Sequence, residues 1–297
     1  MASIRRFTAF ILSAVAGMAL AASCAAAADP ADGKSTVTVA VTNDFSSWNP
    51  YGDSTAVVYG IWCQIYGCLG TYDYEKGDYV GMLAESWEVD KNDHNLWTFH
   101  LRKGMKRHVD GKELTAEDVV HSVWRIKNDK QSVQGFNVRP IKSAKAIDKY
   151  TVQFVTAKPT AELPVFLFDN VYITGKDLYD KYGARKADRE HPLGWGPYMI
   201  KDIDIGQRMV LEKNPNWPGI KKANPDRLIF VRIKEDEARV TSLLNGEIQI
   251  AQAIPAHLMK RVEDSAKAGL RTAAPTEDMF LGMNLKYKPW DNKLARQ

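Results

Sequence analysis

The chain has 297 residues, of which 45% are hydrophobic and 26% charged, and its 40 lysines and arginines against 36 aspartates and glutamates give a formal net charge of +4. This near-balance argues against a nucleic-acid-binding surface, because such surfaces need a clear excess of basic side chains. Beyond residue 28 no apolar stretch approaches the roughly 20 residues that a membrane-spanning helix needs.

The first 28 residues have the pattern of a secretory signal. Two arginines are followed by an apolar run too short to cross a bilayer and then by alanines before Asp29. We therefore expect a Sec-type signal peptide over residues 1–28 and a periplasmic mature protein. Cys24 offers a lipoprotein anchor as an alternative, but Leu20 lies one position too far upstream for a good lipidation motif.

Residues 36–42 alternate valine with threonine and predict the first strand. The polar turn 43–50 follows, and a loop at the carboxyl end of a strand is a natural place for ligand contacts. Asp44, Phe45 and Ser46 are therefore candidate ligand-binding residues. The Asp44 carboxylate suits a cationic ligand group, and Phe45 either walls a pocket or belongs to the core.

Two cysteines remain once the signal is removed, Cys63 and Cys68. In an oxidising compartment so close a pair can form a small-loop disulfide, while two free buried thiols are the alternative. We favour the disulfide. A metal site would need more ligands than these two, and no histidine lies near them in the sequence.

Three apolar side chains alternate with polar ones in residues 96–102, so they share one face of a half-buried strand. Asp110 and Gly111 then form a turn pair. Thr115 is followed three residues later by Asp118, a capping arrangement that opens a helix at residue 116.

A two-strand signal follows over residues 143–147 and 150–156, with a tight turn at 148–149. Residues 176–182 predict a short helix, and Gly183 is its expected C-cap. Together with the preceding strand and helix, these segments are numerous enough to form a subdomain with its own modest core.

A hairpin is predicted after this region. Residues 194–198 read Gly-Trp-Gly-Pro-Tyr, and alternating residues lead through a turn at Gly206 into a second strand over 208–213. Trp195 between the two glycines is a further candidate ligand-binding residue that would wall a pocket, with an ordinary core position as the alternative.

Residues 228–233, 236–245 and 247–251 predict a strand, a helix and a strand, the order of a parallel crossover unit. Gln252 and Ala253 directly follow the last strand and are candidate ligand-binding residues. The Gln252 carboxamide offers both a donor and an acceptor.

An amphipathic helix is predicted over residues 256–268 and a further strand over 279–285, where Met279 and Phe280 complete the candidate site. The sequence contains no serine-hydrolase elbow, His-Glu-x-x-His motif or phosphate-binding loop. We therefore predict no catalytic residue, no metal site and no cofactor.

Several of these segments resemble the large extracellular solute-binding proteins of family 5, which feed peptide and nickel ABC transporters. The resemblance rests on residues 99–104 with 114–122, on 43–50, on 194–198 with 214–217, and on 246–249. Two positions depart from the family pattern: Trp195 stands where a small polar residue is usual, and Gln249 where aspartate is usual.

The resemblance implies a mixed α/β fold, the first lobe of a type II periplasmic binding protein with an inserted α+β subdomain. It assigns residues 29–56 and 189–275 to that lobe, 57–188 to the inserted subdomain, and 276–297 to a crossover into a second lobe. We expect this second lobe to be absent, because the sequence stops where relatives enter it.

The function implied by the resemblance is that of a periplasmic, monomeric substrate-binding component of an ABC importer. Closure over an oligopeptide or dipeptide would be recognised by the permease subunits at the inner membrane. The alternatives are a receptor or chaperone-like protein of the same fold, or an importer component for a nickel complex, a sugar or an opine. An exported hydrolase is the least favoured reading.

Overall fold

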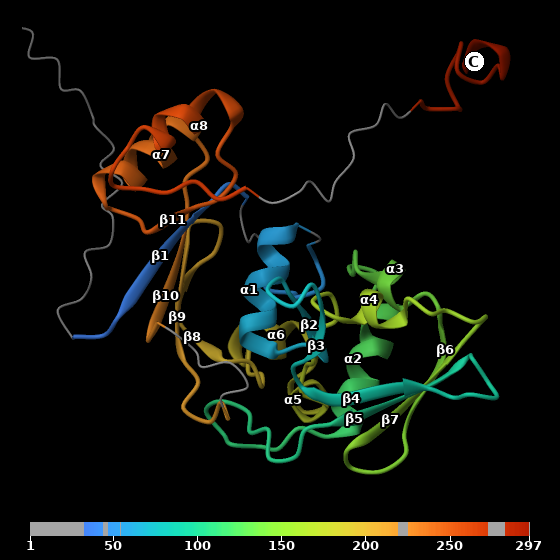
Figure 1. Cartoon of the computed structure of the whole chain (residues 1–297). Coiled ribbons are helices and arrows are strands. Elements are labelled where there is room, and N and C mark those ends of the chain that lie inside the picture. Colours follow the sequence, from blue (N-terminus) through green and yellow to red (C-terminus); the bar gives the residue numbers. More distant parts are fainter. Residues whose placement is uncertain (1–32, 44–46, 54, 219–224, 273–282, 297) are drawn as a thin grey trace, which may run out of the picture.

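The computed structural model describes residues 33–43, 47–53, 55–218, 225–272 and 283–296 (Figure 1). None of the helices found in these ranges is both long and apolar enough to cross a membrane. The helices are α1 (Ala56–Tyr66), α2 (Ala116–Asn128), α3 (Gly135–Val138), α4 (Leu163–Leu167), α5 (Lys176–Tyr182), α6 (Ala184–Glu190), α7 (Asp236–Asn245) and α8 (Ala256–Glu263), with a 3-10 turn at Leu294–Arg296.

The first sheet joins strands from the two ends of the described chain in the order β11-β1-β10-β9-β8. These strands are β1 (Thr36–Val41), β8 (Tyr198–Asp204), β9 (Arg208–Lys213), β10 (Arg227–Arg232) and β11 (Ile250–Ala251). β1 runs parallel to both of its neighbours, β10 and β11, whereas β9 and β8 form the predicted antiparallel hairpin. The chain therefore crosses from β10 through α7 to the parallel strand β11, as the sequence predicts, and β11 lies on the far side of β1.

β11 is shorter than the predicted strand over 247–251. The residues before it are used to end α7, because Gly246 takes a left-handed conformation and Glu247 N–H donates to Ser242 O. Gln249 N–H bonds to Thr38 O, and ladder pairing then covers only Ile250 and Ala251.

The second sheet lies wholly in the middle of the chain and has the order β4-β5-β7-β6. It contains β4 (Ala84–Val89), β5 (Leu96–Leu101), β6 (Ile141–Ala146) and β7 (Thr151–Thr156), all antiparallel, and a separate hairpin is formed by β2 (Gly70–Asp73) and β3 (Asp78–Gly81). Trp97, Phe99 and Leu101 of β5 are buried and alternate with half-buried residues, as the alternation predicts.

α2 begins where the capping pattern places it. Thr115 and Asp118 form a reciprocal capping box, in which Thr115 N–H donates to the Asp118 carboxylate at 3.0 Å. Val119 and Val123 are fully buried, and α2 packs on β6 and β7 (Figure 1). A short sequence signal therefore fixes both the start of this helix and the face that it buries.

One large core connects both sheets, α1 and α2, whereas α7 and α8 share a separate small core of Val240, Leu258 and Val262. A buried ion pair also ties the segment after β1 to the middle of the chain. Arg125 of α2 donates to Asp188 of α6 at 2.6 Å and to Asn49 at 3.1 Å, with its guanidinium 4.8 Å from the Tyr51 ring centre. A buried pair with this many partners fixes the orientation of its elements more than it adds net stability.

The hairpin segment Gly194-Trp195-Gly196 packs directly on the end of α1. Trp195 N–H donates to Tyr66 O and Gly196 N–H to Ile65 O, both at 3.0 Å. A Cβ atom added at either glycine would lie 2.2–2.4 Å from backbone atoms of α1. The two glycines therefore permit a close approach of two backbone segments.

The C-terminal predictions need two corrections. α8 ends at Glu263 and not at residue 268, because Ser265 N–H turns back to Val262 O and the Ser265 side chain accepts from Lys267 N–H. Within the predicted strand 279–285, residues 283–285 form no strand and are exposed, and the first four residues lie outside the described ranges.

His108 gives the fold a defined pH dependence. Its Nε2 accepts from Gly194 N–H at 2.9 Å, and burial together with the Arg107 charge lowers its pKa to about 4, partly opposed by Asp110. The unfolded chain takes up this proton as the pH falls below about 6.5. The contribution of neutral His108 to the free energy of unfolding is therefore fully present above pH 6.5. We expect up to about 3 kcal/mol of this free energy to be lost progressively as the pH falls towards 4.

Urea unfolding at pH 7.0 and 4.5 measures this loss. The variant His108→Gln keeps an acceptor for Gly194 but has no group that titrates in this range, so it should lose less stability than the wild type between the two pH values. Equal losses in the two proteins would contradict the assignment, and the comparison cancels the contributions of the carboxylates.

Candidate functional site

β1, β10 and β11 are parallel, so their carboxyl ends lie side by side at one end of the first sheet. We call this row of strand ends the sheet edge. In open α/β sheets this edge is where ligands bind, close to the point at which the strand order reverses. The reversal falls at β1, since the chain crosses from β10 on one side to β11 on the other. Asn43, Lys234, Gln252 and Ala253 follow the three strands, and all four are exposed.

Gln252 and Ala253, both predicted from the sequence, occupy this edge. Gln252 N–H donates to Ala40 O at 3.0 Å, so the main chain remains attached to β1 for one residue beyond β11. Ala253 then adopts a left-handed backbone with φ of 52°. A residue with a Cβ carries a conformational cost of about 1 kcal/mol there, and such outliers gather at functional sites.

Arg239 of α7 holds the Ala253 segment in place. Its guanidinium donates to Ala253 O at 2.7 Å, to Ile233 O at 3.0 Å and to Lys234 O at 3.2 Å, and it pairs with Asp236. The Arg239 side chain is fully buried, although the residues that it binds lie at the exposed edge. One side chain therefore fixes the loop after β10 relative to the loop after β11.

The sequence did not single out Arg239. The only local signal is its position three residues after Asp236 in the first turn of a predicted helix, which is also the pattern of an ordinary surface pair. The contacts that matter are made with carbonyl groups in two loops, and these become visible only when the crossover is formed.

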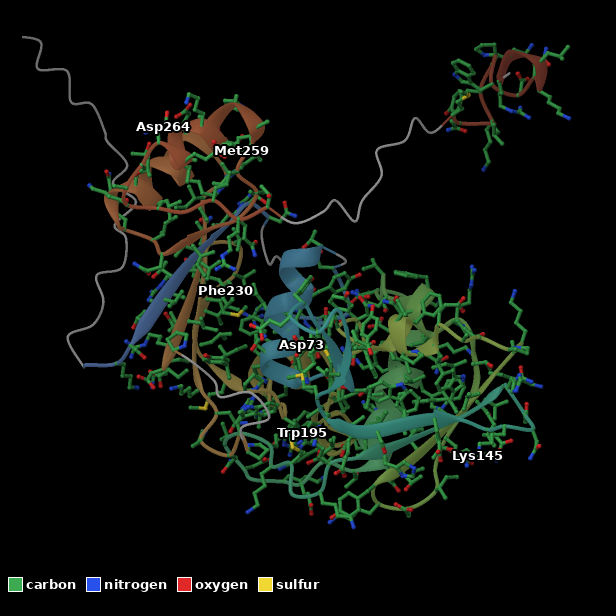
Figure 2. The ribbon with its side chains drawn as sticks, in the orientation of Figure 1. Asp73, Lys145, Trp195, Phe230, Met259 and Asp264 are labelled. Carbon is green, nitrogen blue, oxygen red and sulfur yellow. The ribbon has the colours of Figure 1, made fainter. Side chains whose placement is uncertain are left out.

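Of the other predicted ligand-binding residues, only Trp195 belongs to the part of the chain that the structure describes. Asp44, Phe45, Ser46, Met279 and Phe280 lie outside the described residues. Trp195 is fully buried: its indole donates to Lys112 O at 2.9 Å, and Arg107 lies 5.5 Å from its ring. Figure 2 places Trp195 far from Met259 and Asp264 at the α8 end of the first sheet. Its side chain is therefore core, and a pocket-wall role is not supported.

The predicted disulfide is not formed. Cys63 and Cys68 are both free and buried. The Cys63 thiol points to Met82, with 3.8 Å between Sγ and Sδ, and burial raises the pKa of Cys68 well above its usual value. The spacing of the two residues was compatible with either state, and the structure has the free thiols.

A pocket of about 540 Å³ lies away from this edge, on the middle part of the chain around the starts of α2 and α5. Its lysines are already ion-paired: Lys112 with Asp177, Lys176 with Asp180, and Lys149 with Glu113. Charges that satisfy one another leave little for a ligand, so we place the candidate site at the sheet edge.

Comparisons with known proteins give one consistent result. The model of the bacterial extracellular solute-binding proteins, family 5 Middle, matches residues 78–297. A probable D,D-dipeptide-binding periplasmic protein of Escherichia coli K12 is 29% identical over 267 residues, which are 89% of this chain and 49% of that protein. A glutathione-binding protein of Shigella boydii is 27% identical over 283 residues, which are 94% of this chain and 53% of that protein.

Solved structures agree with the fold. A periplasmic binding protein of A. tumefaciens R10 in complex with mannopinic acid is 24% identical with a TM-score of 0.76, covering 87% of this chain and 53% of that one. A Helicobacter pylori periplasmic binding protein in complex with the peptide STSA is 25% identical with a TM-score of 0.69, covering 78% and 49%. These likenesses confirm the predicted α/β fold, and the chain spans about half the length of the proteins that it matches.

Proposed function

Because this chain belongs to the bacterial extracellular solute-binding proteins of family 5, we propose that it is the substrate-binding component of an ABC importer for oligopeptides or dipeptides. It is exported to the periplasm by a signal within residues 1–28, and it works as a monomer that delivers its ligand to the permease subunits. Its role is binding and not catalysis.

The observation that carries this proposal is the edge formed by the ends of β1, β10 and β11. We expect a bound peptide to lie across these strand ends and to be held by polar groups of the loops that follow them, while neighbouring side chains provide selectivity. Gln252 supplies a carboxamide donor and acceptor, and Lys234 supplies an ammonium group for a carboxylate.

A thermal-shift screen of the purified chain tests the proposal. Pools of dipeptides, longer oligopeptides, glutathione, opines, sugars and nickel chelates are added separately. We expect a peptide pool to raise the melting temperature, because a ligand selective for the folded state stabilises it by about 2.7 kcal/mol at 100 times its dissociation constant. A shift from only the opine, sugar or nickel pool would overturn the peptide assignment and retain a solute-binding role.

Matched variants locate the binding surface. Gln252→Ala should reduce the shift, because it removes a carboxamide at the proposed edge. Gln131→Ala should leave the shift unchanged, because Gln131 is an exposed residue just beyond α2. Loss of the shift in both variants, or in neither, would argue against the edge as the binding site.

A further inference from the structure

A second pocket, of about 460 Å³, lies where α5 ends and α6 begins. Its lining includes one aromatic ring and four charged side chains, those of Tyr182, Arg185, Lys186, Arg189 and Glu190. Figure 1 shows α5 and α6 away from α7 and α8, and none of the described residues at the sheet edge lines this pocket. Peptide binding at the sheet edge therefore does not account for it.

Two positive charges of this pocket are not neutralised. The four acidic side chains of α5 and α6 are already paired with other cations: Asp177 with Arg107, Asp180 with Lys176, Asp188 with Arg125, and Glu190 with Lys186. Arg185 and Arg189 are both exposed, and in the described part of the chain their guanidinium groups have no ion-pair or hydrogen-bond partner. The lysines of the larger pocket are neutralised, whereas these two arginines are available to a ligand.

The spacing of the two arginines brings their charges to one place. Arg185 and Arg189 are four residues apart on α6, so their side chains leave the same face of the helix, with Cβ atoms about 5–6 Å apart. Like charges at this spacing repel each other and destabilise a helix. An anion between them turns the repulsion into attraction, because each guanidinium then donates charge-assisted hydrogen bonds to it. The pair therefore favours a negatively charged ligand.

Tyr182 and Lys186 complete the wall of the pocket. The Tyr182 ring stacks on His191, with ring centres 4.0 Å apart and 23° between the ring planes. Lys186 Nζ lies 5.7 Å from the centre of the Tyr182 ring and 3.6 Å from the Glu190 carboxylate. Lys186 therefore offsets the charge of the acidic residue in the lining, and the two arginines remain in excess.

We propose that Arg185 and Arg189 bind a phosphomonoester. Three cations and one carboxylate in the lining leave a charge of +2. A phosphomonoester carries a charge of about −1.5 to −2 at pH 7 and has three acceptor oxygens, so it can neutralise this charge and accept from both guanidinium groups. A single carboxylate carries one charge and two oxygens, which one arginine already satisfies. A soluble phosphomonoester and the headgroup of a lipid such as phosphatidic acid share this chemistry.

The test is isothermal titration calorimetry of the purified chain with glycerol 3-phosphate at an ionic strength of about 0.01 M, where exposed charges are little screened. We expect one ligand per chain. The double variant Arg185→Gln/Arg189→Gln should weaken binding at least tenfold. Arg139→Gln/Arg271→Gln is the matched control, since it removes the same charge from two exposed arginines that do not line the pocket.

Melting temperatures separate a binding role from a structural one. Without ligand, the variant Arg185→Gln/Arg189→Gln should melt at the same temperature as the wild type or slightly higher, because the repulsion between the two arginines is removed. With glycerol 3-phosphate, the wild type should gain stability and this variant should not. A lower melting temperature of the variant without ligand would show that the two arginines stabilise the fold, and would overturn the proposal.

Vesicles distinguish the two sources of the ligand. Phosphatidylcholine vesicles are sedimented with the protein, with and without phosphatidic acid. Binding of glycerol 3-phosphate supports a soluble ligand, and binding only to vesicles with phosphatidic acid supports a lipid headgroup. The proposal is overturned if neither binds, if acetate binds as tightly as glycerol 3-phosphate, or if the control variant loses as much affinity as the pocket variant. Peptide binding is measured separately, and its failure would leave this proposal unaffected.

Discussion

Replacing Gly196 by alanine is expected to destabilise the protein by at least about 3 kcal/mol. The new Cβ would lie 2.2 Å from the Gln64 carbonyl oxygen and 2.6 Å from its carbon, and these are backbone atoms of α1 that cannot turn aside as a side chain can. Relief of the clash must separate the hairpin from α1, which breaks the Gly196 N–H to Ile65 O bond and opens the packing around Trp195. Overpacking alone costs about 1–3 kcal/mol, and lost hydrogen bonds add to it.

Gly60→Ala is the matched control for this change. Gly60 is an exposed residue inside α1, and no atom lies within 4 Å of the position that its Cβ would take. Because alanine is the better helix former, this variant should be unchanged or up to about 1 kcal/mol more stable. Urea denaturation of the two variants provides the comparison, and similar free energies of unfolding would refute the close-packing role of Gly196.

Local signals account for most of the fold that could be predicted. The capping box at Thr115 and Asp118, the alternation in residues 96–102 and the turn at 148–149 all operate within a few residues, and each produced the expected element. The parallel crossover from β10 to β11 was also predictable, because the strand, helix and strand order allows few arrangements.

The predictions that failed concern features that depend on contacts with other parts of the chain. Nothing near Trp195 indicates whether an aromatic residue between two glycines faces a ligand or the core, and the end of α1 decides that it is buried. The lengths of β11 and α8 were overestimated, because periodicity continues past the point where Gly246 and Ser265 turn the chain. The two cysteines are free and buried, and they contact residues that lie elsewhere in the sequence: the Cys63 thiol contacts Met82, and Cys68 forms a backbone bridge with Tyr172.

The candidate site was predicted only in part, for the same physical reason. Gln252 and Ala253 could be chosen because they follow a predicted strand, and the structure places them at the expected sheet edge. The side chain that fixes their position, Arg239, belongs to α7 and acts through main-chain carbonyls. Every residue has a main-chain carbonyl group, whatever its side chain. A single sequence therefore does not show which carbonyl groups a side chain will bind.

Arg239→Met is expected to reduce both stability and ligand binding. Methionine fills a similar volume but donates no hydrogen bond, so the carbonyl groups of Ile233, Lys234 and Ala253 lose the donor that the buried Arg239 side chain supplies. Removing a buried charged donor costs about 3 kcal/mol when its partners remain unsatisfied. α7 and α8 share only a small core, so little else compensates for the loss on this side of the sheet.

Arg261→Met provides the control on the same helical unit. Arg261 lies on α8 and pairs with Glu237 and Thr241 of α7, but its side chain is 43% exposed. Exposed pairs of this kind contribute about 0–1 kcal/mol, so the loss should be small. Urea unfolding of both variants separates the buried arginine from the exposed one, and equal losses would show that Arg239 is not an anchor.

Arg239→Lys distinguishes positioning of the edge from general stability. Lysine keeps the charge but lacks the planar fork that reaches two loops at once, so it can serve the Ile233 loop or Ala253 but not both. We expect it to recover part of the unfolding free energy lost in Arg239→Met while binding of the best peptide from the thermal-shift screen stays weakened. Recovery of both to the same extent would mean that Arg239 affects ligand binding only through stability. A weakened binding constant at restored stability would show that the exact placement of Ala253 matters to the ligand.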